Sequence, residues 1–155
     1  MNEAVVAGAL AVATFNVVAG LLGGWLWYRG APGDRRQLRL FWVLLRVAQG
    51  SAIVYAAAVG LLAAAGNSSS GQLFYLYALL PLAVALVAEQ LRVASAQTIL
   101  DQRGLKDAQA VGGLPAAEQQ GVLAAIVRRE IGVMALSALV VVFLALRAAG
   151  TAHGF

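Results

Sequence analysis

The sequence predicts an all-α integral membrane protein, folded as an antiparallel bundle of four transmembrane helices. Of the 155 residues, 61% are hydrophobic and only 12% are charged, whereas about 25% of the residues in soluble domains are charged. The apolar residues also gather in four separate stretches, each long enough to cross a hydrocarbon core of about 30 Å as a helix. The whole chain, residues 1–155, is expected to form a single transmembrane domain with spans at about residues 5–28, 38–65, 73–97 and 121–147.

The first stretch, residues 5–28, is expected to remain as a helix because it stays apolar for longer than the hydrophobic region of a signal peptide. Asn16, Gly20 and Gly24 follow at intervals of four residues, which places them on one helix face. Small residues at this spacing allow close helix packing in membranes. We expect this face to pack against the second helix of the same chain, with a second copy or a partner subunit as the alternative.

The second stretch, residues 38–65, carries a matching face of small residues at Ala52, Ala56 and Gly60. This match is the reason for pairing the first two helices with each other. The segment that joins them, residues 29–37, is basic and is expected to form a loop.

The third and fourth stretches are expected to extend beyond the bilayer. A Gly-Gly-Leu-Pro segment ends at Pro115, and proline is common at the first position of a helix. A helix that starts there and runs through residues 121–147 would be about 50 Å long, which exceeds the hydrocarbon thickness. We therefore expect the third and fourth helices to project into the cytoplasm as a hairpin around a loop at residues 98–120.

Basic residues predict the orientation. All of the 11 Lys and Arg residues except Arg147 lie in or beside the loops at residues 29–37 and 98–120. Because cytoplasmic loops are enriched in Lys and Arg, both loops should be cytoplasmic. Both termini are then expected outside the cytoplasm, in a multi-pass protein of the cell membrane.

Composition also limits the chemistry. Cysteine is absent and the one histidine is His153, so thiolate chemistry and a haem held by two imidazoles are excluded. The serines lack a plausible base, and we expect no enzyme activity, no cofactor and no metal site. The net charge of +4 sits beside the spans instead of on a separate basic face, so no nucleic-acid partner is expected.

Charged and amide side chains within the spans form a predicted ionic layer. Counted from the outer helix ends at about 1.5 Å per residue, Arg46, Glu89 and Glu130 fall at similar depths of roughly 22 to 29 Å. An unpaired charge at the bilayer centre costs about 2.5 to 3.5 kcal/mol on insertion scales, so we expect Arg46 or Arg129 to bridge to the two carboxylates. The buried layer is predicted to comprise Arg46, Gln49, Glu89, Arg92, Arg129 and Glu130.

Three functions are compatible with this layer. It could lock the helices in register, with neighbouring arginines reaching anionic lipid at the cytoplasmic face of the bilayer. It could contact another membrane subunit or a second copy. It could instead line a proton- or anion-linked path through Arg46, Glu89 and Glu130. We expect a non-enzymatic accessory or scaffold subunit, or a self-associating bundle, with a small transporter or channel as the alternative.

Overall fold

A computed structural model of the chain is helical wherever it has regular structure in residues 2–30, 34–67 and 71–152, which are the residues it describes. His153 lies outside them. The predicted all-α class is confirmed, and four helices are long and apolar enough to cross a membrane, as a multi-pass membrane protein requires. The helices are α1 (Asn2–Arg29), α2 (Arg35–Ala64), α3 (Gln72–Gln102), the short α4 (Ala108–Gly112) and α5 (Ala116–Thr151).

The segment between α3 and α5 is more helical than the sequence prediction of a loop at residues 98–120. The α3 helix continues through its polar end to Gln102, and α4 forms within the segment. Asp107 caps α4, because its Oδ1 accepts a 2.9 Å hydrogen bond from the backbone N–H of Ala110. Gly104 ends α3 with a φ of 68°, a conformation that glycine adopts without steric cost.

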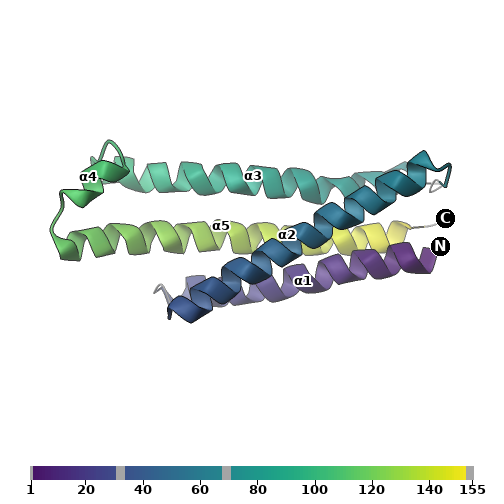
Figure 1. Ribbon diagram of the computed structural model, residues 1–155, viewed down its shortest axis with the longest axis horizontal. Coiled ribbons are helices and arrows are strands. Elements are labelled where there is room, and N and C mark those ends of the chain that lie inside the picture. The colour runs from purple at the N-terminus through teal and green to yellow at the C-terminus, as the bar shows by residue number, and fades with distance from the viewer. Residues whose placement is uncertain (1, 31–33, 68–70, 153–155) are drawn as a thin grey trace.

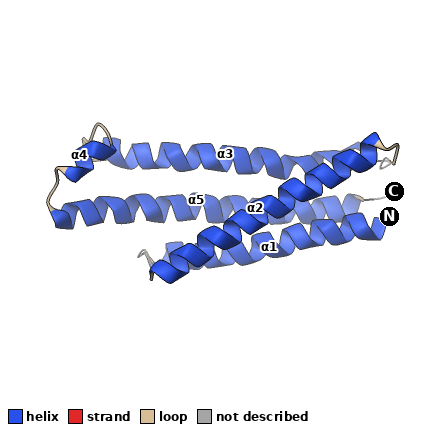
Figure 2. Ribbon diagram, in the orientation of Figure 1, coloured by secondary structure: helices blue, strands red, loops and turns tan. Residues whose placement is uncertain are grey.

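The α5 helix is the centre of the molecule. It packs along α1 on one side and along α3 on the other, whereas α2 packs against α1, meets α3 over a shorter stretch and scarcely touches α5. Figure 1 shows α2 crossing the other long helices obliquely, with the first and last described residues at the same end of the molecule. In Figure 2 the α3–α4–α5 hairpin extends past the end of α1 and the start of α2.

Three apolar clusters hold the helices together. One lies toward the terminal end of the molecule and includes Tyr55 and Phe74. The second draws on all four long helices and includes Phe41 and Met134, both fully buried. The third lies at the tip of the hairpin, where α3, α4 and α5 contribute Leu100, Val111 and Val122.

The outer surface of the long helices is also apolar. Large side chains that point away from the core include Leu21, Val54, Leu86 and Phe143, each more than 60% exposed. Soluble proteins rarely present apolar patches of this extent. Such a surface fits contact with lipid tails.

Candidate functional site

The candidate site is a cluster of polar side chains on the seam between α2 and α3. The Arg46 guanidinium donates from Nη1 to Oε1 of Glu89 at 2.6 Å and to Oε1 of Gln49 at 2.7 Å. Gln49 in turn donates from Nε2 to the same Glu89 oxygen at 3.4 Å. Because Arg46 and Gln49 are three residues apart on α2, they lie on one face and hold a single carboxylate oxygen between them.

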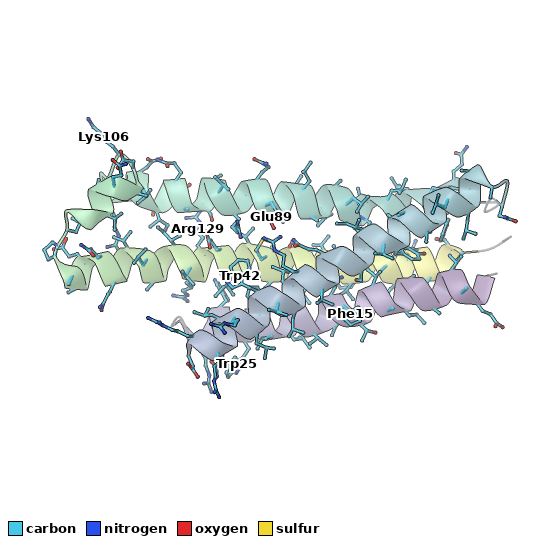
Figure 3. All side chains as sticks on the ribbon, viewed as in Figure 1. Phe15, Trp25, Trp42, Glu89, Lys106 and Arg129 are labelled. Carbon is cyan, nitrogen blue, oxygen red and sulfur yellow. The ribbon has the colours of Figure 1, made fainter. Side chains whose placement is uncertain are left out.

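Arg92 completes the cluster from the α3 side. Its Nε lies 3.4 Å from Oε2 of Glu89, the carboxylate oxygen that Arg46 leaves free. Its guanidinium carbon lies 5.4 Å from the centre of the Trp42 ring on α2, within the range of a cation–π contact. Arg92 therefore contacts α2 through the Trp42 ring, whereas its contact with Glu89 lies within α3. Figure 3 shows Glu89 and Trp42 on these two neighbouring helices.

The cluster is less buried than the sequence predicted. The side chains of Arg46 and Glu89 are 55% and 28% exposed, and Arg92 is 29% exposed. The oblique crossing of α2 places the seam at the periphery of the molecule, away from the axis of α5. The long arginine side chains lie along this surface and keep part of each guanidinium open to the surroundings.

Arg129 and Glu130 do not join the cluster in the way the sequence predicted. Glu130 forms no ion pair within 4 Å in the described part of the chain, although Arg92 and Glu89 act on it through space. Arg129 instead lines a groove between α5 and α1. Consecutive residues of an α-helix point about 100° apart, so these two neighbours face different helices.

A small void lies at the centre of the four long helices. It has a volume of about 10 Å³, and its mostly apolar lining includes Asn16, Gln49, Pro81 and Ser137, one residue from each long helix. A void of about this size is at the lower limit for one water molecule. The Gln49 side chain belongs both to this void and to the Glu89 cluster.

The buried Asn16 forms the polar contact between α1 and α2. Its Nδ2 donates to the carbonyl of Val12 at 2.9 Å and to that of Ala48 on α2 at 3.5 Å. The second bond is long, so the amide contributes more to its own helix than to the neighbour. The Asn16 side chain also borders the central void.

The predicted small-residue face is divided between different helices. A Cβ at Gly20 would lie 2.8 Å from Leu139, so this residue faces α5 and not α2. Gly24 and Gly60 have no atom within 4 Å of a Cβ position, so neither is a tight contact. Ala52 and Ala56 of α2 are buried as predicted.

The close contacts involve three glycines that the sequence reasoning did not identify. A Cβ would lie 2.9 Å from Tyr55 at Gly8, 2.5 Å from Phe41 at Gly23, and 2.8 Å from Trp27 at Gly132. In each case a large aromatic ring rests on the bare backbone of another helix. No sequence signal pairs a given glycine with a given ring, because the pairing depends on which helices become neighbours.

Comparison of the chain with protein-family models, with curated proteins and with solved structures finds no match. The site must therefore be interpreted from its own geometry.

Proposed function

We propose that the chain is a non-enzymatic scaffold or accessory protein of the cell membrane, in which the Arg46–Glu89–Arg92 cluster locks α2 onto α3. The observation that carries the proposal is the pair of contacts to Glu89, 2.6 Å from Arg46 and 3.4 Å from Arg92. They lie where two candidate membrane spans meet over a short stretch. Apolar packing is limited there, and an ion pair supplies a contact with one defined register.

The proposed orientation has both termini outside the cytoplasm and both basic loops inside. Basic and aromatic side chains gather where α1 ends, which supports this orientation. Arg29 lies 4.1 Å from the ring centre of Trp25, and Arg128 lies 5.6 Å from that of Trp27. Tryptophan and basic residues are enriched together at the cytoplasmic interface of membrane proteins.

In this orientation the α3–α4–α5 hairpin projects into the cytoplasm. Arg128 of α5 donates to the carbonyl of Trp27, near the end of α1, at 3.3 Å. The residues of α5 that precede Arg128 therefore lie beyond α1, and residues 116–127 would span about 18 Å at the helical rise. The cluster of Leu100, Val111 and Val122 gives this projection a small core of its own, as a docking surface for another subunit requires.

The proposal is tested by replacing Glu89 with its uncharged isostere. Glu89→Gln should lower the unfolding temperature of the purified protein in mild detergent, while proton and anion fluxes in proteoliposomes stay at the level of empty liposomes for both proteins. Glu118→Gln is the matched control, because Glu118 is exposed in the first turn of α5. A wild-type flux above background that Glu89→Gln abolishes would overturn the scaffold proposal.

A transport function is the second candidate, and the central void favours it. Gln49 connects Glu89 to the void, which Asn16 and Ser137 also line, so polar groups continue from the α2–α3 seam to the centre of the protein. If the void belongs to a path, Ser137→Ala should lower a flux while the unfolding temperature stays near that of the wild type. If the protein is a scaffold, no flux exists for this substitution to change.

The two forms of scaffold differ in what they bind. An accessory subunit should purify with a different membrane protein at a fixed stoichiometry, whereas a self-associating bundle should purify as an oligomer of this chain alone. Native mass spectrometry in mild detergent distinguishes the two. A monodisperse monomer would contradict both.

A further inference from the structure

A groove between α1 and α5 has an apolar floor and a basic mouth. Its volume is about 480 Å³, within the range of roughly 300 to 1,000 Å³ that is typical of small-molecule sites. Its floor follows one face of α5 from Arg129 through Gly132 and Leu136 to Leu139, a length of about 15 Å at the helical rise. On α1 the groove is bounded by Gly24 and Trp27.

Gly24 makes the groove deep on the α1 side. A Cβ at this position would meet no atom within 4 Å, so the missing side chain leaves space that the protein does not fill. Leu136 is 65% exposed, and it presents an apolar surface along the same space. The groove can therefore hold a flexible hydrocarbon chain against both helices.

The mouth of the groove is positively charged. Arg129 is exposed, and in the described part of the chain its guanidinium has no hydrogen bond or ion pair. Arg128 is held beside it by the carbonyl and the ring of Trp27. Among the described residues, no carboxylate lies within 4 Å of either guanidinium.

Trp27 adds a neutral donor at the same place. Its indole rests on Gly132, with Nε1 2.9 Å from the position of a Cβ there. The bare backbone of Gly132 thus sets the position of the ring between the basic mouth and the apolar floor. The Arg129 guanidinium lines the groove beside this ring, and a guanidinium is suited to bind the oxygens of a phosphate.

We propose that this groove binds one anionic phospholipid of the cytoplasmic leaflet, with its phosphate at Arg129 and an acyl chain along Gly24, Leu136 and Leu139. This lipid site deepens the proposed function and rests on the proposed orientation of the protein, which places the mouth of the groove at the headgroups of the inner leaflet. A second copy of the chain fits less well, because an apolar helix laid over the groove would cover Arg129 without supplying a counter-charge.

The test measures lipid retained by the purified full-length protein in mild detergent, using native mass spectrometry. Three probes are added separately: phosphatidylglycerol, phosphatidylcholine with the same chains, and glycerol 3-phosphate. The wild-type protein should retain one phosphatidylglycerol in preference to the other two. Arg129→Gln should weaken this retention about fivefold, as expected for the loss of one basic residue at an anionic lipid surface, while Arg39→Gln, at another exposed arginine, should not change it.

A second substitution blocks the groove without disturbing the fold. Gly24→Leu should abolish the preferential retention while the unfolding temperature is maintained, and Gly60→Leu is its control because Gly60 also has open space at Cβ. Equal retention of phosphatidylcholine, retention of glycerol 3-phosphate alone, or unchanged binding by Gly24→Leu would each overturn the lipid site. A dimer that Gly24→Leu dissociates would assign the groove to a second copy instead. None of these outcomes depends on the α2–α3 lock, which Glu89→Gln tests separately.

Discussion

Arg46 and Glu89 are 43 positions apart in the sequence, and their side chains meet at 2.6 Å. The contact joins α2 and α3 at a seam where the two helices share little apolar packing. Gln49 and Arg92 occupy the remaining positions around the same carboxylate. One acid thus has partners from both helices, and removing it leaves Arg46 without an ion pair among the described residues.

A double-mutant cycle should measure this coupling directly. Arg46→Gln and Glu89→Gln should each destabilise the protein, and the double variant should lose less than the sum of the two. We expect a coupling of about 1 to 2 kcal/mol, because the pair is partly exposed and yet joins two charged groups at short distance. Reversible unfolding in mixed detergent micelles provides the free energies. Additive effects would show that the two side chains do not interact energetically.

Adjacent glycines on α1 should respond in opposite directions to the same substitution. At Gly23 a Cβ would lie 2.5 Å from Phe41 and 2.8 Å from Ala135, so Gly23→Ala should destabilise the protein by about 1 to 3 kcal/mol through overpacking. At Gly24 a Cβ meets nothing within 4 Å, so Gly24→Ala should raise stability by up to about 1 kcal/mol through helix propensity. Thermal unfolding of the two variants measures both changes in stability. If both substitutions changed the unfolding temperature in the same direction, α1 would be rotated differently about its axis.

Removing the hydroxyl of Tyr55 should stabilise the protein. Tyr55 is buried, and its hydroxyl has no hydrogen-bond partner among the residues that the structure describes. An unsatisfied buried polar group costs about 1 to 3 kcal/mol, so Tyr55→Phe should raise the unfolding temperature. Tyr28→Phe should have no effect because Tyr28 is 81% exposed. A loss of stability in Tyr55→Phe would indicate that a water molecule or ligand satisfies the hydroxyl.

The orientation can be read from single cysteines, because the chain has none of its own. Asn67→Cys, after the end of α2, should react with a membrane-impermeant maleimide in intact cells. Ala110→Cys, on α4, should react only after the membrane is made permeable. The reverse pattern would place the basic loops outside the cytoplasm and would move the proposed lipid site to the outer leaflet.

The sequence was sufficient to predict the helices. Apolar runs of membrane length determine where a helix can span the bilayer, and the hydropathy of a run follows from its amino-acid composition alone. The start of α5 at Ala116 agrees with the helix start predicted at Pro115, whereas α3 runs on to Gln102, in a segment that was predicted to be a loop. A helix that is already formed continues through polar residues at little cost.

The contacts between helices were only partly predictable. Counting residues from the helix ends placed Arg46 and Glu89 at a similar depth in the membrane, and the two side chains do form an ion pair. Counting residues does not predict which neighbouring helix a side chain faces, since this depends on which helix occupies the centre of the bundle. With α5 in that position, Gly20 faces Leu139 and Arg129 faces the groove beside α1, and no property of a single helix reveals this choice.

The continuous α5 helix gives the molecule a mechanical property. It runs from Ala116 at the hairpin tip to Thr151 at the opposite end without a proline, and it is the element on which α1 and α3 both rest. Because α5 packs along both neighbours, it joins the hairpin tip to the opposite end of the molecule as one stiff element.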